Sequence, residues 1–273
     1  MREFAGRVAV ITGAGSGIGR ALAEKAAAEG MTVVIADIDL AALEETERIL
    51  KGEGATALAV QVDVADPDSV DRLAREALDE YGAVHLVFNN AGVGAGTTVW
   101  ESSLADWHWV LGVNLWGVIH GVRAFLPILL QQDEGHVVNT ASVAGVLPYH
   151  PSGPYLVSKH AVVGLTEHLA VSLKQANAPV GASVLLPSWV RTNILASEEH
   201  RPAALRNPAP PASDDGTMAW MQQAVASGMA PEQVAERVFD GIREGRLYLF
   251  THPDHKNELE QRYQAMLASM PAR

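Results

Sequence analysis

Short apolar runs alternate with longer amphipathic stretches along most of this chain, and that pattern predicts strands joined by helices. Within each short run the apolar residues follow one another with little polar alternation, which is typical of parallel strands buried on both faces. The sequence therefore predicts an α/β fold with a doubly wound parallel sheet of about seven strands and helices on both faces. The expected strands are 7–12, 31–37, 55–63, 84–89, 136–142, 181–186 and 247–250. The expected helices are 17–30, 40–51, 67–81, 104–131 and 155–175.

No break in composition divides this alternation, so we expect a single domain over residues 1–273. The stretch 193–230 is irregular, with four prolines and one polar, turn-like sequence: Pro202, Pro208, Pro210, Pro211 and 213–216. A long insertion without secondary structure in a compact domain is commonly a functional lid or a disordered segment. Its position after the sixth predicted strand favours a substrate-binding lid over about 193–230.

The charge balance narrows the classes of partner. Lys and Arg number 20 against 32 Asp and Glu, a formal net charge of −12, which argues against nucleic acid or an anionic membrane as partner. The most apolar stretch, 109–130, is interrupted by Asn114, His120 and Arg123, so it predicts a buried helix rather than a membrane span. The N-terminus lacks the apolar stretch and cleavage site of a signal peptide, so we expect a cytoplasmic protein that acts on a small molecule.

The composition also limits the reactive groups. The chain has no cysteine, which excludes disulfides, thiolate metal sites and cysteine nucleophiles. Its ten histidines form neither an H-x-H nor an H-E-x-x-H pattern, so no metal site is predicted.

A glycine-rich turn, Thr12-Gly-Ala-Gly-Ser-Gly-Ile-Gly19, stands between the first predicted strand and the first predicted helix. Such a turn lets the backbone approach a pyrophosphate and directs the N–H groups of the following helix towards it. The spacing is not G-x-G-x-x-G, and a glycine cluster alone is also compatible with a simple tight turn. The position between strand and helix favours dinucleotide binding.

Asp37 ends the second predicted strand, 24 residues after Gly13. An acidic side chain at that place can hold the ribose hydroxyls of an adenosine, and its charge would repel the 2′-phosphate of NADP(H). The sequence therefore predicts NAD(H) as the cofactor. Two alternatives stay open: Asp37 as an ordinary helix cap, and Asp39 as the ribose ligand.

Tyr155 and Lys159 are four residues apart at the start of a predicted helix, so they lie on one face, about 6 Å apart along the axis. An ammonium group beside a phenol favours the phenolate by roughly 3 kcal/mol. We therefore expect the pKa of Tyr155 to fall from near 10 towards about 7 to 8, where tyrosine is a general acid or base. A solvated surface pair is the alternative. Ser142, at the end of a predicted central strand, favours a site because ligands bind at that sheet edge.

These features occur with others in an order that resembles the short-chain dehydrogenase/reductase family, whose motifs TGxxxGxG and YxxxK both occur here. The resemblance covers 7–192 and implies a Rossmann-like fold. It rests on 12–19, Asp63-Val64, Asn89-Asn-Ala-Gly92, Asn114, Ser142, Tyr155-Leu-Val-Ser-Lys159 and Pro187-Ser-Trp-Val-Arg-Thr192.

The resemblance implies four catalytic residues. Tyr155 would exchange a proton with the substrate oxygen, and Ser142 would hydrogen-bond that oxygen. Lys159 would hold the nicotinamide ribose and lower the pKa of Tyr155. Asn114 would anchor a water that links Lys159 to solvent, although an asparagine in an apolar helix can instead bond a neighbouring carbonyl.

The resemblance also implies a cofactor site. Asp63 and Val64 would border the adenine, 90–92 would form the floor, and the backbone at Val190 and Thr192 would bind the carboxamide. The chain departs from the family directly after Pro187: glycine is usual there, and this chain has Ser188-Trp189. A side chain in place of glycine puts the geometry of the substrate side near Trp189 in doubt. The implied cofactor residues are Gly13, Gly15, Ser16, Gly17, Ile18, Gly19, Asp37, Asp63, Val64, Asn90, Ala91, Gly92, Tyr155, Lys159, Pro187, Val190 and Thr192.

The predicted substrate residues are Tyr149 and Trp189. With Met218, Trp220 and Met221 they would form an apolar pocket under a mobile lid, which indicates an apolar alcohol or ketone. The lid aromatics could equally pack the lid onto the body or onto another subunit. His150 could contact substrate or be a solvated loop histidine.

We therefore expect an NAD(H)-dependent alcohol dehydrogenase or carbonyl reductase that transfers a hydride between a secondary alcohol or ketone and nicotinamide. The alternatives are a nucleotide-binding regulatory or scaffold protein without turnover, and a non-redox lyase or epimerase of the same family. The resemblance implies a homo-oligomer, a homotetramer or dimer. The tail 257–268 places Leu259, Tyr263, Met266 and Leu267 on one helical face, which could cover the sheet edge or the lid, or join subunits.

Overall fold

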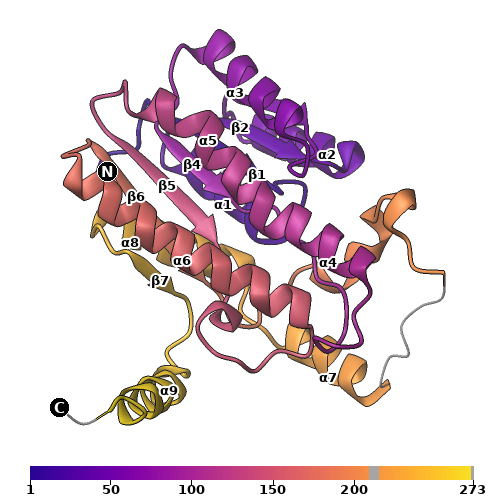
Figure 1. Ribbon diagram of the computed structural model, residues 1–273. Helices are drawn as coiled ribbons and strands as arrows, with labels where there is room; N and C mark the ends of the chain where they lie inside the picture. The colour runs from indigo at the N-terminus through magenta and orange to yellow at the C-terminus, as the bar shows by residue number, and fades with distance from the viewer. Residues whose placement is uncertain (209–214, 272–273) are drawn as a thin grey trace.

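Seven parallel strands form one sheet in the order β3-β2-β1-β4-β5-β6-β7 (Figure 1). The computed structural model describes residues 1–208 and 215–271. Strand order reverses between β1 and β4, and ligands bind at such a switch point in open α/β sheets. The predicted doubly wound fold is confirmed. The strands are β1 (Val8–Thr12), β2 (Thr32–Asp37), β3 (Ala57–Gln61), β4 (Leu86–Asn89), β5 (Gly135–Thr140), β6 (Val180–Leu186) and β7 (Tyr248–Phe250).

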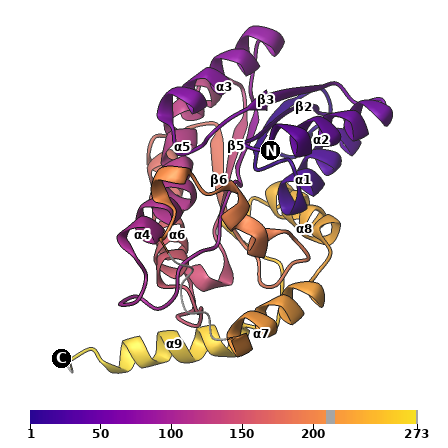
Figure 2. The ribbon, with the colours of Figure 1, turned by 90° about the vertical axis from the view of Figure 1, so that its right-hand side faces the viewer.

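Helices cover both faces of this sheet (Figure 2). One face packs against α1 (Gly17–Ala28), α2 (Leu40–Gly52) and α8 (Pro231–Arg243), and the other against α3 (Pro67–Tyr81), α5 (Gly117–Leu129) and α6 (Gly153–Gln175). Every residue of β1 and of β5 is buried, which explains their lack of polar alternation. The other helices are α4 (Leu104–Leu111), α7 (Asp215–Ala226) and α9 (Lys256–Ala268).

Local signals set several helix ends. Asp66 caps α3 by accepting a hydrogen bond from the backbone N–H of Asp68, and Pro67 occupies the first position of the helix, where its missing N–H costs nothing. The helix ends at Gly82, whose φ of 71° is a left-handed conformation that favours glycine. The predicted bounds 67–81 are confirmed.

The predicted helix 104–131 is interrupted by a π-helical turn, Gly112–Trp116, between α4 and α5. By length and composition, Leu104–Leu129 could cross a membrane. Its side chains Trp109, Val110 and Phe125 are buried in the protein, as expected of a core helix. Single-turn π segments mark functional sites in many proteins, and this one contains Asn114.

The described parts of the stretch 193–230, which are 193–208 and 215–230, are more ordered than the sequence predicts. They contain two 3₁₀ segments, Ile194–His200 and Ala203–Leu205, followed by α7. Short 3₁₀ turns have no extended periodicity that a sequence pattern would reveal. The helix α8 was missed although its buried residues recur at helical spacing: Val234, Ala235, Val238, Phe239 and Ile242. The predicted lid residues Pro210, Pro211, Ser213 and Asp214 lie outside the described residues.

Candidate active site

The glycine-rich turn joins β1 to α1 at the carboxyl edge of the sheet and packs tightly against the residues after β4. A Cβ atom on Gly13 would come within 2.7 Å of Ala91 Cα, and one on Gly19 within 2.0 Å of the Gly13 oxygen. The φ angles of Gly13 and Gly17 are 67° and 53°, in the left-handed region. Ala91 N–H also donates to the Thr12 hydroxyl, at 3.1 Å. Both the close approach and the backbone conformation therefore require glycine.

Asp37 lies beside this turn. Its Oδ2 accepts from the Gly15 N–H at 2.8 Å, and its Oδ1 accepts from the Asp39 N–H at 3.0 Å. The Asp39 side chain instead accepts from the Ala42 N–H at 3.1 Å and caps α2. The contacts thus distinguish the two aspartates: Asp39 caps the helix α2, and Asp37 lies at the glycine-rich turn.

Neighbouring strand ends complete this side of the site. Asp63 Oδ1 accepts from the Ala65 N–H at 2.9 Å, and the Val64 oxygen lies 2.9 Å from His120 Nδ1. Asn90 Nδ2 donates to the Thr12 oxygen at 3.0 Å. Asn90 thus ties the end of β4 to the end of β1, and Val64 ties the residues after β3 to α5.

The residues after β6 lie next to the same turn. A Cβ atom on Gly17 would be 2.9 Å from Thr192 Cγ2. A cavity of about 390 Å³ opens here, bordered by Arg20, Thr192 and Asn193. Pro187 lies further along the edge, where its oxygen accepts from the Ser142 hydroxyl at 3.2 Å. The loop after β6 therefore spans from the turn to Ser142.

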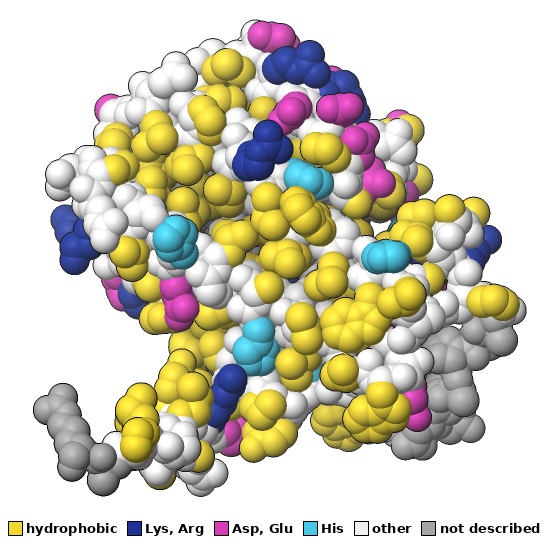
Figure 3. All heavy atoms as spheres, viewed as in Figure 1, with side chains coloured by type: hydrophobic (Ala, Val, Ile, Leu, Met, Phe, Trp, Pro, Cys, Tyr) yellow, Lys and Arg dark blue, Asp and Glu magenta, His cyan; other side chains and the backbone are white. Residues whose placement is uncertain are grey.

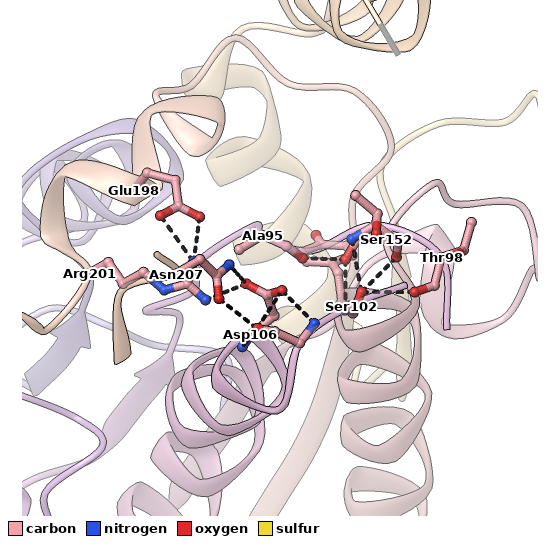
Figure 4. Close-up of polar contacts among 11 residues, drawn as sticks. Ala95, Thr98, Ser102, Asp106, Ser152, Glu198, Arg201 and Asn207 are labelled. Carbon is pink, nitrogen blue, oxygen red and sulfur yellow. Dashed lines mark hydrogen bonds and ion pairs between the residues drawn. The ribbon is translucent and has the colours of Figure 1, made fainter. Parts of the chain in front are cut away.

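Ser142, Tyr155 and Lys159 meet at the ends of β5 and α6. Ser152 caps α6: its hydroxyl accepts from the Tyr155 N–H at 3.2 Å and donates to the Ala95 oxygen (Figure 4). The Lys159 ammonium lies 5.5 Å from the centre of the Tyr155 ring and donates to the Thr140 oxygen at 2.9 Å. The four-residue spacing thus places both side chains on one helix face, as predicted.

Burial changes the expected titration of this pair. It raises the pKa of Tyr155, and a hydrogen bond with Ser142 opposes the rise. Burial also lowers the pKa of Lys159 to about 8. The prediction of a depressed tyrosine pKa is therefore wrong for the free protein. It included the attraction between ammonium and phenolate and left out the cost of removing both charges from water.

Lys159→Met should stabilise the free protein at pH 7 by about 1 to 3 kcal/mol, because methionine carries no charge to bury. The unfolded pKa of 10.5 exceeds the folded value of about 8. The charged lysine therefore destabilises the fold fully below about pH 8, and the cost disappears between about pH 8 and 10.5. Urea unfolding at pH 7 and pH 10 should show the advantage of the variant shrink as the pH rises.

Lys174→Met, at the exposed end of the same helix, is the matched control and should change the unfolding free energy little at pH 7. A Lys159→Met protein that is less stable than the wild type at pH 7 would contradict this account.

Asn114 lies in the π-helical turn and is fully buried. Its Oδ1 accepts from the Val93 N–H at 2.8 Å, and its Nδ2 donates to the Val93 oxygen at 3.0 Å and to the Ser158 hydroxyl at 3.1 Å. A Cβ atom on Gly92 would lie 3.4 Å from Asn114 Oδ1 and 3.5 Å from Lys159 Nζ. Asn114 thus bonds neighbouring backbone, as one interpretation of the sequence held, and also lies close to the lysine.

His150 stacks on the catalytic candidate Tyr155, with ring centres 4.5 Å apart. Its Nδ1 accepts from the Ser152 N–H at 3.1 Å, and burial lowers its pKa to about 4. His150 is therefore neutral near pH 7, not a solvated loop residue. Tyr149, in contrast, is 77% exposed.

Trp189 packs edge-on against Trp220 of α7, with ring centres 5.3 Å apart. This contact brings together the loop after β6 and the predicted lid. It also agrees with the interpretation that a lid aromatic packs the lid onto the body of the protein.

A buried ion pair that sequence reasoning missed anchors the segment 194–207 to α4 (Figure 4). Arg201 contacts Asp106, with side chains 2% and 3% exposed, and lies 4.7 Å from the ring centre of Trp109. Glu198 contacts Arg201 at 3.0 Å, and Asn207 donates to Asp106 at 2.9 Å. Burial alone would raise the pKa of Asp106, but Arg201 and Asn207 hold it below its usual value. No local pattern in the sequence indicates this contact, because its partners are 95 residues apart in the chain.

Within residues 1–208 and 215–271 we find no group of three or more His, Asp or Glu side chains that could hold a metal ion.

Comparison with known proteins agrees with this arrangement. A family model described as short chain dehydrogenase matches residues 7–203. A CLA biosynthesis dehydrogenase/reductase of Lactiplantibacillus plantarum is 34% identical, with 96% of this chain and 93% of the relative covered. The C alpha-dehydrogenase of Sphingobium sp. is 30% identical, with 99% and 88% covered.

A solved structure of a short chain dehydrogenase/reductase from Burkholderia phymatum, in complex with NAD, superposes with a TM-score of 0.95. It is 49% identical, and the match covers 100% of this chain and 99% of that one. The chain therefore belongs to the short-chain dehydrogenase family.

Proposed function

We propose that this protein is an NAD(H)-dependent oxidoreductase that transfers a hydride between a secondary alcohol or ketone and nicotinamide. The observation that carries the proposal is the meeting of Ser142, Tyr155 and Lys159 at the sheet edge that also carries the glycine-rich turn. An enzyme with tyrosine acid–base chemistry needs this whole set, whereas a nucleotide-binding scaffold does not.

The residues around the turn fit NAD. A Cβ on Gly13 would clash with Ala91 and one on Gly19 with the Gly13 oxygen, so glycine keeps this turn tight at the start of α1, where helix N–H groups suit a pyrophosphate. Each Asp37 oxygen accepts one backbone hydrogen bond and keeps capacity for a ribose hydroxyl. When bound, the nicotinamide would supply the hydride acceptor or donor. The other proposed cofactor residues are Gly15, Ser16, Gly17, Ile18, Asp63, Val64, Asn90, Ala91, Gly92, Tyr155, Lys159, Pro187, Val190 and Thr192.

Tyr155 moves the proton. Because burial raises its pKa, the phenol is protonated near pH 7 and can donate its proton to a carbonyl oxygen as negative charge develops there. In the oxidative direction the phenolate form of Tyr155, stabilised by the Lys159 charge, accepts the proton of the alcohol and becomes the neutral phenol. Ser142 hydrogen-bonds the same substrate oxygen. Asn114 hydrogen-bonds Val93, and the neighbouring Gly92 lies beside both Asn114 and Lys159, so Asn114 helps to hold the surroundings of Lys159 in place.

An apolar substrate suits this site. The Trp189–Trp220 pair supplies an aromatic wall beside the loop after β6. We assign the exposed Tyr149 to the outer rim of the substrate site. In this proposal the protein is one domain over 1–273, and residues 193–230 serve as its substrate-binding lid. The wall and the anchored lid support an alcohol or ketone with a ring or a chain of carbon atoms.

Several apolar side chains on α4, on the π-helical turn and on α6 are exposed, and Figure 3 shows apolar surface over this part of the molecule. We propose that this face joins subunits of a homotetramer or dimer in the cytoplasm, since exposed apolar patches commonly mark interfaces. The residues are Leu104, Trp116, Val157 and Val171.

The test is a panel of secondary alcohols, including steroids, terpenols and aromatic alcohols, each assayed with NAD. The proposal expects absorbance at 340 nm to rise with at least one alcohol. Conversion of a substrate without net change in NADH would indicate a lyase or epimerase instead. Tight NADH binding with no conversion of any substrate would indicate a regulatory protein.

A further inference from the structure

The C-terminal segment 252–262 contacts both loops that border the candidate active site. His255 Nε2 lies 2.9 Å from the hydroxyl of Ser188, which follows Pro187 in the loop after β6. Arg262 contacts the Val146 oxygen, four residues beyond Ser142, and lies 3.1 Å from Nε2 of His160, the neighbour of Lys159. One short stretch of chain thus bridges the loop after β6, the loop after β5 and the helix α6.

The direction of the hydrogen bonds at Ser188 follows from the chemistry of the groups. Glu258 Oε2 lies 2.9 Å from His255 Nδ1, and an ionised carboxylate only accepts, so Nδ1 carries the proton. In neutral His255, Nε2 is therefore an acceptor, and the Ser188 hydroxyl donates to it. Glu258 in this way orients the imidazole towards the loop after β6.

A serine that is hydrogen-bonded to a histidine, which in turn is hydrogen-bonded to a carboxylate, also occurs in hydrolases, where the serine acts as nucleophile. In such sites the backbone N–H of the serine can help to bind the oxyanion. Here the Ser188 N–H donates to His252 Nδ1 at 3.4 Å, so this donor is engaged within the protein. The arrangement serves as a link between two segments.

The two contacts lie on one face of α9. His255, Leu259 and Arg262 are separated by four and three residues, which is the spacing of neighbours on a helix surface. Leu259 packs against a core cluster that includes Val146. Further along the chain, where the helix has left the body of the protein, side chains on the same side are more than half exposed: Tyr263, Met266, Leu267 and Met270. Of the residues predicted to share one apolar face, only Leu259 reaches the core, and Figure 1 shows α9 standing off from the sheet.

We propose that Ser188, His255 and Arg262 are positioning residues, and that segment 252–262 is a clamp that holds the loop after β6 against the loop after β5. This inference rests on the proposed function. The first loop carries Val190 and Thr192 on the nicotinamide side, and the second follows Ser142 on the proton-transfer side. The rate falls strongly when the groups that exchange the hydride and the proton are displaced relative to one another. A fixed distance between the two loops would therefore keep kcat high. Serine at 188, where the family usually has glycine, supplies the hydroxyl that the clamp needs.

Three variants of the full-length protein test the clamp. Ser188→Ala removes the hydroxyl, Ser188→Thr keeps a hydroxyl, and Met266→Ala changes an exposed side chain about one turn beyond Arg262 in the same helix. Hydrogen exchange of 188–192 is measured without substrate, and kcat and KM are measured with NAD and an alcohol. We expect Ser188→Ala to speed exchange in 188–192 and lower kcat by about tenfold, which corresponds to one lost hydrogen bond. Ser188→Thr and Met266→Ala should stay within twofold of the wild type in both readouts.

Arg262→Gln tests the other end. A clamp requires both ends, so the Ser188→Ala/Arg262→Gln double variant should have the kcat of the slower single variant, whereas independent effects would multiply. Unchanged exchange in Ser188→Ala would overturn the clamp even if no substrate were turned over. Faster exchange with unchanged kcat would overturn its positioning role. A wild type without NAD-dependent turnover would instead refute the proposed function.

Discussion

Tyr155→Phe should lower kcat for alcohol oxidation by about a thousandfold, because it removes the phenol oxygen that exchanges the proton and keeps the ring. The ring stacks on His150, so the shape of the site should be retained. Binding of NADH, followed by the quenching of protein fluorescence, should change less than about tenfold, because a single hydrogen bond is at stake.

Tyr81→Phe, at the end of α3, is the matched control and should leave kcat unaltered. Equal turnover by Tyr155→Phe and the wild type would eliminate Tyr155 as the proton-transfer group. Equal loss of turnover and of NADH affinity would place the defect in binding.

Asp37→Ala should weaken the discrimination between NADH and NADPH by about 100-fold. In its proposed role the wild-type carboxylate would accept hydrogen bonds from ribose hydroxyls and repel a 2′-phosphate, and alanine can do neither. Titrating each nucleotide separately against wild type and variant measures the ratio of the two dissociation constants. The wild type should prefer NADH, and the variant should bind the two more equally.

Asp39→Asn is an informative control, because it removes a charge two residues away while asparagine still caps α2. Its preference for NADH should match that of the wild type. A wild type that bound NADPH more tightly than NADH would refute the role of Asp37, and a loss of preference in Asp39→Asn alone would move that role to Asp39.

Much of the fold was predictable because its signals are local. Continuous apolar runs located the seven strands, and Asp66 with Pro67 located the start of α3. The π-helical turn around Asn114 was not predictable, because it depends on hydrogen bonds to the distant Val93 and Ser158. The segment 194–207 was predicted as irregular because its order comes from Arg201 on Asp106, about a hundred residues away in the chain.

The candidate site divides in the same way. The spacing of Tyr155 and Lys159 predicted their common helix face, since a helix places residues four apart together. The choice between Asp37 and Asp39 required the structure, because both are near the end of β2 and only the tertiary contacts distinguish a cap from a residue beside the turn.

The sequence alone indicated the kind of chemistry: a dinucleotide turn, an acidic residue at the end of β2, and a serine, tyrosine and lysine in the order in which the family carries them. Those features depend on residue type and short spacing, which the chain carries directly. Only the tertiary structure decided that burial raises the pKa of Tyr155, that Arg201 anchors 194–207, and that Ser188 meets His255. Desolvation and contacts between distant residues arise only when the chain is packed, so no local pattern could have predicted them.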